Sequence, residues 1–219
     1  MILGVIPARL NSTRFPSKVI FPLKGKPIIE HVYEKALQSK LLNKVIVAVD
    51  SEETRNVINC QNIMMTSDKH QSGTDRVAEV ADNFDCDVVV NIQGDEPGIN
   101  PLLIDQLIQL FEDPDVEMAS IASTDLKEDD LNNDNVVKVN LDEENNAISF
   151  IRNNLNPEST YYRHIGIYAY RKNTLNLFTS LSQSDNEKNH RLEQLRALDN
   201  NIAIKLLISD FSHRSIDVK

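Results

Sequence analysis

The chain has 219 residues, of which 41% are hydrophobic and 26% are charged, and its formal net charge is −10. This composition is typical of a folded soluble protein long enough to bury a sizeable core. The negative charge excludes nucleic acid and acidic membrane surfaces as favoured partners. The apolar start is too short for a signal peptide, and no run reaches the roughly 18 apolar residues of a membrane helix. We therefore expect a cytoplasmic protein without a membrane partner.

Short apolar runs rich in β-branched residues alternate with helical patterns in the first half of the chain. The expected strands span 2–6, 44–49 and 87–92. Pro27 is expected to open a helix, and further helices are expected over 52–59, 74–83 and 102–111. The first helix should bury one face, made of Ile28, Ile29, Val32, Tyr33, Ala36 and Leu37. This alternation predicts an α/β fold with a mostly parallel sheet flanked by helices, and a ligand crevice at the carboxyl ends of the strands.

The rhythm changes after residue 122. Two runs with partial alternation, 136–141 and 147–151, flank an acidic, Asn-rich turn at 142–146 and predict a β-hairpin. We interpret this hairpin, within about 123–163, as a small lobe or a dimerisation element. A strand over 162–170, helices over 174–181 and 188–198, and a last strand over 202–208 should follow. The whole chain, 1–219, is expected to form one domain.

Cations gather near the N-terminus, and the rest of the chain carries the acids. Five cations and no acid lie between Met1 and Ile29, and three of the cations, Arg9, Arg14 and Lys18, follow the first strand directly. Arg and Lys in such a loop suit the oxygens of a triphosphate and the charge that builds up on leaving pyrophosphate. The alternative is an ordinary solvated basic loop. The two cysteines, Cys60 and Cys86, are expected as core residues.

Two common nucleotide-binding motifs are absent. The chain has six glycines, and they form neither a Walker A sequence nor a Gly-x-Gly-x-x-Gly motif. NTP hydrolysis and NAD chemistry are therefore poor candidates. A buried strand instead ends in the polar turn at 93–97, which carries Asp95. Mg²⁺ often takes one or two carboxylates together with phosphates and water, so Asp95 is a candidate metal ligand; the alternative is an Asp that accepts backbone N–H groups in its turn.

Four ordered sequence blocks resemble one family of bacterial sugar nucleotidyltransferases. The stretch 6–18, followed by Gly25-Lys26-Pro27, is similar to the opening of these enzymes. The blocks at 68–76, 91–97, 163–168 and 192–196 together resemble the 3-deoxy-manno-octulosonate (Kdo) cytidylyltransferase family, with a correspondence from Ile2 to about Ile208. The resemblance implies a Rossmann-like nucleotide-diphospho-sugar transferase fold. It also implies Mg²⁺-dependent transfer of CMP from CTP to the sugar acid of lipopolysaccharide, with release of pyrophosphate.

The resemblance also implies a set of site residues. Arg9, Lys18 and Asp95 would be catalytic. Residues that would bind the nucleotide are Pro7, Ala8, Arg9, Arg14, Lys18, Gln71, Ser72, Gly73, Arg76 and Asp95. Residues that would bind the sugar are Gln93, Arg152, His164, Tyr168, Glu193 and Gln194. Asp95 and Asp217 would hold Mg²⁺. In the alternative interpretation, His164 and Tyr168 are buried side chains with satisfied polar tips, and Glu193 and Gln194 form a solvated helix face.

The chain departs from the family pattern at three places. Ser17 and Val19 stand where the family usually has Gly and Pro, and Leu155-Asn156 stands where it has Ile-Pro. Asp217, the expected second metal ligand, lies two residues before the last residue given. These departures leave two alternatives open: activation of a related keto sugar acid, such as 8-amino-Kdo or a nonulosonic acid, and a non-catalytic nucleotide-binding protein. A homodimer formed through the hairpin is a further implication of the resemblance.

Overall fold

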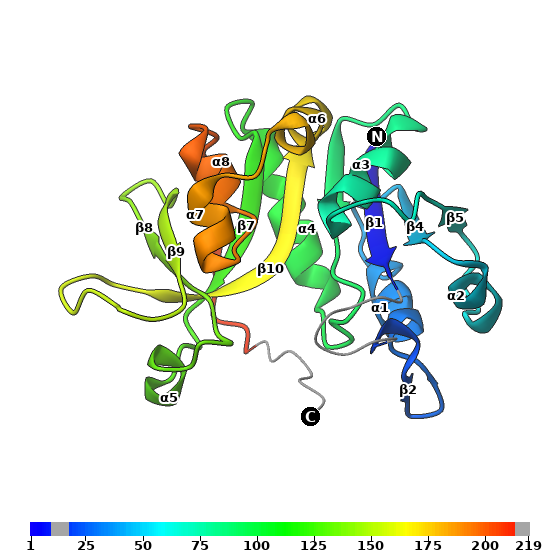
Figure 1. Cartoon of the computed structure of the whole chain (residues 1–219), viewed down its shortest axis with the longest axis horizontal. Coiled ribbons are helices and arrows are strands. Elements are labelled where there is room, and N and C mark those ends of the chain that lie inside the picture. The colour runs from blue at the N-terminus through cyan, green and yellow to red at the C-terminus, as the bar shows by residue number, and fades with distance from the viewer. Residues whose placement is uncertain (10–17, 213–219) are drawn as a thin grey trace. The chain divides into compact units, whose positions relative to one another are not determined.

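The computed structural model describes residues 1–9 and 18–212 (Figure 1). The described chain consists of two compact units, which run from Met1 to Ile108 and from Gln109 to residue 212. The predicted hairpin lies inside the second unit. The single domain expected from the sequence stays a prediction.

The first unit is built on a parallel sheet. Strand β1 (Ile2–Ala8) pairs in parallel with β4 (Lys44–Val49) on one side and with β6 (Val88–Asn91) on the other, and β4 pairs in parallel with β5 (Ile63–Met65). The residues of β1, β4 and β6 are almost all buried, as continuous apolar strands require. The prediction of a parallel sheet from the β-α-β alternation is therefore confirmed in this unit. The short β5 was not predicted.

Helices follow the strands of this unit in the expected order. They are α1 (Ile28–Ala36), α2 (Glu52–Val57), α3 (Gly73–Asp82) and α4 (Pro101–Gln109). Before α1 lie a 3₁₀ turn, η1 (Lys18–Ile20), and a small hairpin of β2 (Pro22–Leu23) and β3 (Lys26–Pro27). The hairpin turn places Gly25 at φ 89°, where a side chain would be strained. The predicted apolar face of α1 is buried except at Leu37, which follows the end of the helix and is exposed.

The second unit contains an antiparallel arrangement. Strand β10 (Tyr162–Arg171) pairs antiparallel with β7 (Met118–Ser123) and with β8 (Lys138–Leu141), and β11 (Ile204–Ser209) runs parallel to β7. Strands β8 and β9 (Ala147–Ile151) form the predicted hairpin. The helical elements of this unit are η2 (Leu110–Glu112), α5 (Glu128–Leu131), α6 (Lys172–Ser180), α7 (Asp185–His190) and α8 (Leu195–Asp199).

The single helix predicted over 188–198 is wrong. The structure has α7 and α8 with a break between them, because Arg191 ends α7 in the left-handed conformation (φ 53°). Leu192, Leu195 and Leu198 have helical spacing, which is why the sequence predicts a continuous helix. Glu193 and Gln194 lie in the break, so they are presented by a tight turn between two helices.

A buried ion pair holds this turn. The guanidinium of Arg196 on α8 donates two hydrogen bonds to the carboxylate of Glu187 on α7, Nε to Oε2 at 2.8 Å and Nη2 to Oε1 at 2.6 Å. The same guanidinium lies over the ring of Phe178 on α6, 4.8 Å from its centroid. Both charged residues are 5% exposed. The pair therefore connects three helices and fixes the chain around Glu193 and Gln194.

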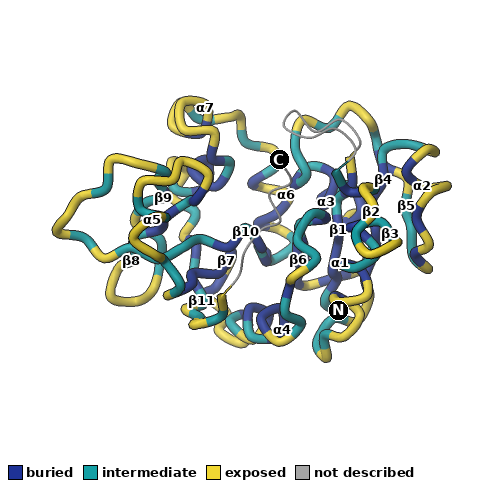
Figure 2. The backbone as a smooth tube through the Cα atoms, turned by 90° about the horizontal axis from the view of Figure 1, so that it is seen from below, coloured by how far each residue is buried: buried dark blue, intermediate teal, exposed yellow. Residues whose placement is uncertain are grey.

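The core of each unit lies along its strands, which are the most buried parts of the backbone in Figure 2. Cys60 and Cys86 are buried and unpaired with each other, as expected, and burial raises the pKa of the Cys60 thiol to about 12. Among the described residues, no helix combines the length and apolar character that crossing a bilayer requires.

We predict that Glu187→Gln destabilises the fold by about 3 kcal/mol, because it leaves the buried charge of Arg196 uncompensated. Urea denaturation should show this loss in the free energy of unfolding. Lys188→Ala is the matched control, since it removes an exposed ion pair with Asp185 from the same helix and should cost less than about 0.5 kcal/mol. Equal losses in the two variants would contradict the assigned role of the buried pair.

Candidate functional site

The carboxyl end of β1 is where two glycines come close to one residue, Pro7. A Cβ atom placed on Gly94 would lie 2.8 Å from the carbonyl oxygen of Pro7, which is closer than real Cβ contacts. A Cβ on Gly73 would lie 3.5 Å from the Pro7 ring, an ordinary van der Waals contact. The turn after β6 and the start of α3 therefore both meet the end of β1, where parallel sheets bind ligands.

The turn after β6 brings Asp95 to Lys18. The Nζ atom of Lys18 donates to Oδ2 of Asp95 at 2.9 Å, and the side chains are 16% and 40% exposed. The structure brings these two residues together, Lys18 from the basic stretch after β1 and Asp95 from the polar turn after β6, 77 positions apart. Of the other predicted residues near the end of β1, Ala8 is buried and Arg9 is exposed. Arg14 lies outside the described residues. A carboxylate paired with one lysine can exchange that partner for a cation, and the lysine can then bind an anion.

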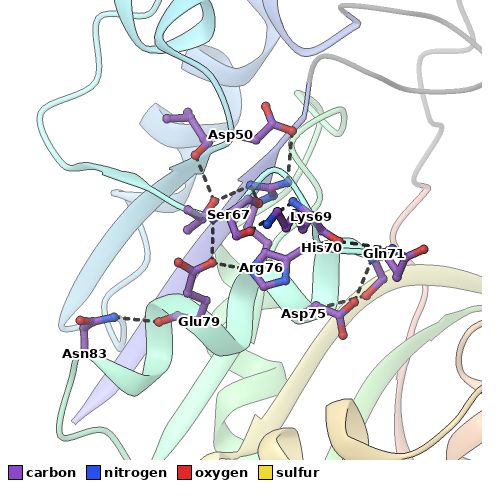
Figure 3. A network of polar contacts seen from close by, with 12 residues as sticks. Asp50, Ser67, Lys69, His70, Gln71, Asp75, Arg76, Glu79 and Asn83 are labelled. Carbon is purple, nitrogen blue, oxygen red and sulfur yellow. Dashed lines mark hydrogen bonds and ion pairs between the residues drawn. The ribbon is translucent and has the colours of Figure 1, made fainter.

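The loop between β5 and α3 is held by two side chains of α3 (Figure 3). Glu79 accepts from the backbone N–H of Ser67 at 2.9 Å and from His70, and Arg76 donates to the carbonyl of the same Ser67 at 3.2 Å. Arg76 and Glu79 are three residues apart and thus share a helix face. Although burial opposes it, these hydrogen bonds lower the pKa of Glu79. Both the N–H and the carbonyl of Ser67 are therefore held, which fixes the loop backbone at this residue.

Arg76 also reaches the end of β4. Its Nη2 atom donates to Oδ2 of Asp50 at 3.1 Å, and its Nη1 atom donates to the hydroxyl of Thr66. Arg76 is only 2% exposed, and burial lowers the pKa of its guanidinium. This geometry gives Arg76 a role in shaping the loop, whereas its predicted contact with a nucleotide stays a prediction. Asp50 was missed in the sequence; an Asp directly after a buried strand is the signal that marks it.

The predicted loop residues lie at the start of α3. Ser72 caps the helix by accepting from the N–H of Asp75 at 3.1 Å, and the Asp75 carboxylate accepts from the N–H of Ser72 at 3.0 Å. This capping box satisfies two backbone groups at the helix start. Gln71 is exposed, and Ser72 and Gly73 are half-buried. The structure thus brings Pro7, Gly73 and Gly94 together, with Ser72 next to them in the chain.

In the second unit, His164 of β10 lies among aromatic side chains. Its ring packs edge-to-face on Phe150 at 4.9 Å between centroids and is tilted against Tyr168 at 5.5 Å. Burial and the charge of Arg152 lower the pKa of His164 to about 3, so the imidazole is neutral near pH 7. Burial also raises the pKa of Tyr168 well above its ordinary value. His164 and Tyr168 are thus neutral neighbours.

Arg152 is anchored through its backbone by a buried lysine. Lys138 of β8 is 0% exposed, and its Nζ atom donates to the carbonyls of Arg152 and Asn133. Burial lowers the pKa of this ammonium group. Arg152 itself donates from Nη1 to the carbonyl of Asp134 at 2.8 Å. The sequence missed Lys138, although a lysine in the apolar run 136–141 is an available signal.

The remaining predicted sugar residues lie in two places. Gln194 is 6% exposed, and Glu193 lies 3.8 Å from Nη2 of the buried Arg196 through its Oε1 atom. The alternative of a solvated helix face is therefore wrong for Gln194, because it is buried. Gln93 belongs to the first unit, where its side-chain amide lies 3.5 Å from Oδ1 of the buried Asn91. Asp217 lies outside the described residues.

We predict that Gly94→Ala weakens CTP binding about tenfold or more, because the new Cβ must push the Asp95 turn away from Pro7. Isothermal titration calorimetry with CTP measures this affinity. Gly98→Ala is the matched control, since a Cβ there meets nothing within 4 Å and the residue is exposed. If both variants bind CTP like the unaltered chain, the close approach at Pro7 does not shape the nucleotide site.

Comparisons with known proteins show which family the chain belongs to. A family model described as cytidylyltransferase matches residues 3–205. A protein of Thermodesulfovibrio yellowstonii named 3-deoxy-manno-octulosonate cytidylyltransferase is 40% identical, over 97% of this chain and 92% of its own length. A protein of the same name from Chloroherpeton thalassium is 41% identical, over 97% and 91%.

A solved structure gives the same result. The structure of CMP:2-keto-3-deoxy-manno-octonic acid synthetase complexed with CTP has a TM-score of 0.92 and 33% identity, over 99% of this chain and 92% of that one. A cytidylyltransferase from Leptospira borgpetersenii, 17% identical with a TM-score of 0.66, shares the fold. The chain belongs to the cytidylyltransferase family and is a nucleotidyltransferase with a mixed α/β fold.

Proposed function

We propose that this chain transfers the cytidylyl group of CTP to the anomeric hydroxyl of Kdo, giving CMP-Kdo and pyrophosphate. The observation that carries the proposal is similarity over nearly the whole chain, at 40% and 41% identity, to proteins named 3-deoxy-manno-octulosonate cytidylyltransferase. The CTP complex of the similar solved structure supports CTP as the donor. The product would serve lipopolysaccharide synthesis, with the enzyme in the cytoplasm.

The reaction requires that the two substrates be positioned, and it needs no protein nucleophile. The C2 hydroxyl oxygen of the sugar acid forms a bond to the α-phosphorus of CTP and loses its proton, while the bond from the α-phosphorus to the bridging oxygen breaks and pyrophosphate leaves. Both substrates are anionic, so neutralising their repulsion and aligning them lowers the barrier. Lys18 is suited to the charge on the leaving pyrophosphate, and the exposed Arg9 follows directly on β1.

Asp95 is the described residue that fits a Mg²⁺ ion best. Its side chain is 40% exposed, follows the carboxyl end of β6 and, among the described residues, pairs with the cation of Lys18. The described residues contain no group of three side chains that could hold a metal, but Mg²⁺ bound with a nucleotide needs only one or two carboxylates. Bound Mg²⁺ would neutralise phosphate charge. Asp217 remains the proposed second ligand.

The sugar acid is proposed to bind in the second unit, at Arg152, His164, Tyr168, Glu193 and Gln194. Gln93, which belongs to the first unit, stays a sugar residue expected from the sequence alone. Arg152 supplies a fixed cation for the carboxylate, and the neutral His164 and Tyr168 can read hydroxyl groups. Lys138 and the Glu187–Arg196 pair hold the backbone on which Arg152 and Glu193 stand. The backbone at Arg152 and near Glu193 is therefore held by buried polar contacts.

The test is incubation of CTP and Mg²⁺ with a panel of Kdo, 8-amino-Kdo and a nonulosonic acid. We expect pyrophosphate and a CMP conjugate, identified by mass spectrometry, with Kdo preferred. Asp95→Asn should lower the rate about 100-fold or more, because a group that stabilises transition-state charge is lost. Asp85→Asn, at an exposed acid, is the control and should keep the rate.

The other outcomes separate the alternatives. A conjugate formed only with 8-amino-Kdo or the nonulosonic acid would change the acceptor and keep the reaction. CTP binding without pyrophosphate release for any acceptor would indicate a non-catalytic protein and contradict the proposal.

We further propose a homodimer formed through the β8–β9 hairpin. Strand β9 pairs only with β8 among the described strands, and its Ile148 is 58% exposed. An apolar residue on an edge strand is a common contact between subunits. Sedimentation velocity should give twice the mass of the chain, and Ile148→Asp should shift the population to monomer.

Leu177→Asp is the control for this prediction, because Leu177 is an equally exposed apolar residue on α6. A monomer in the unaltered chain, or the same dissociation in both variants, would contradict a dimer built on the hairpin.

A further inference from the structure

Strand β10 contains an irregularity next to His164. Its pairing with β7 keeps register from Arg163 to Ile165 and again from Ala169, with a shift between them. Ser120 of β7 lies at this shift and is 0% exposed. Its hydroxyl donates toward the carbonyl oxygens of Ile165 and Ile167, at 3.2 Å and 2.9 Å. A side chain therefore supplies the hydrogen bond where the ladder is interrupted.

The same hydroxyl contacts the imidazole. The Oγ atom of Ser120 lies 2.9 Å from Nε2 of His164. A serine hydroxyl has one proton, and a carbonyl oxygen can only accept. If the hydroxyl gave its proton to Nε2, its lone pairs would face both carbonyl oxygens; if it donates to the Ile167 carbonyl, it can accept a hydrogen bond from the imidazole. The second arrangement satisfies more groups, and it favours the Nε2–H tautomer with a lone pair on Nδ1.

The other ring nitrogen, Nδ1, has no described protein partner. Among the described residues, the contact with Ser120 is the one hydrogen bond of the His164 side chain. Phe150 and Tyr168 pack against the ring, and the charge of Arg152 acts with burial to keep it uncharged. A neutral imidazole held in this way accepts a hydrogen bond at Nδ1 and offers no positive charge.

We propose that Ser120 is a positioning residue, which holds His164 as the Nε2–H tautomer so that Nδ1 accepts a hydrogen bond from a hydroxyl group of the sugar acid. The proposal rests on the proposed function, because it takes the sugar acid as the ligand of His164. It divides the recognition chemistry between neighbours: His164 selects a hydroxyl donor, and Arg152 provides the cation for a carboxylate. A carboxylate oxygen at Nδ1 would face the lone pair of that nitrogen and be repelled.

The first experiment measures the tautomer directly. Long-range ¹H–¹⁵N correlation spectra of the full chain, labelled with ¹⁵N-histidine and assigned with His164→Gln, distinguish protonated from unprotonated ring nitrogens. We expect a neutral ring with the proton on Nε2 in the absence of any ligand. A proton on Nδ1, or a mixture of tautomers, overturns the proposal, and this result does not depend on the variant folding or on which sugar acid is used.

The second experiment removes the hydroxyl. Ser120→Ala should mix the tautomers and raise KM for the sugar acid about five- to tenfold, as expected for one hydrogen bond, while KM for CTP changes less than about twofold. Ser120→Thr restores a hydroxyl and should restore the tautomer and KM. Ser123→Ala is the control, because Ser123 is an equally buried serine of β7 that donates to Phe211 instead.

The outcomes keep this proposal separate from the proposed function. If no sugar acid of the panel is converted, the proposed function fails, while the tautomer of the unaltered chain still supports or overturns the role of Ser120. A general structural effect would change both KM values equally, and the control Ser123→Ala would show it as well. If Ser120→Ala changes both KM values equally, Ser120 is only structural and the proposal is overturned.

Discussion

The close approach at Pro7 is the constraint on which the first unit depends. Gly94 can lie against the Pro7 carbonyl because it has no side chain, and Gly73 packs near the Pro7 ring, so the Asp95 turn and the start of α3 both meet the end of β1. Lys18, in η1, contacts Asp95. Residues from Pro7 to Asp95 thus meet at the carboxyl end of a parallel strand, where ligands bind in such sheets.

Buried polar contacts perform the corresponding task in the second unit. Lys138 holds the backbone of Arg152, the Glu187–Arg196 pair holds the turn of Glu193, and Ser120 holds the ring of His164. A buried charge or hydroxyl is costly unless its partners are fixed, so each contact also restricts the local chain. These contacts restrict the backbone at Arg152, the turn of Glu193 and the ring of His164, and such restriction before binding reduces the entropy lost when a ligand binds.

The sequence predicted most strands and helices because the pattern of apolar residues depends directly on which side chains are buried. Examples are the apolar runs of β1 and β4 and the alternation in the β8–β9 hairpin. It failed at Arg191, since leucines spaced three apart suit a helix whether or not the backbone breaks between them. The meeting of Lys18 with Asp95 was predictable from two loops that follow parallel strands. The role of Ser120 was not, because its partners lie at least 44 positions away on β10 and no residue type marks them. A lysine in an apolar run does mark Lys138, but nothing in the sequence marks the carbonyls of Asn133 and Arg152 as its partners.

The most direct test of this account is a map of backbone amide chemical shifts during titration of the ¹⁵N-labelled chain with CTP. The account predicts that the largest changes occur around Pro7, at Ala8, Ser72, Gly73, Gly94 and Asp95, and that amides of the β8–β9 hairpin change little. The largest changes on the hairpin, or none at Gly73 and Gly94, would contradict the claim that the end of β1 binds the nucleotide.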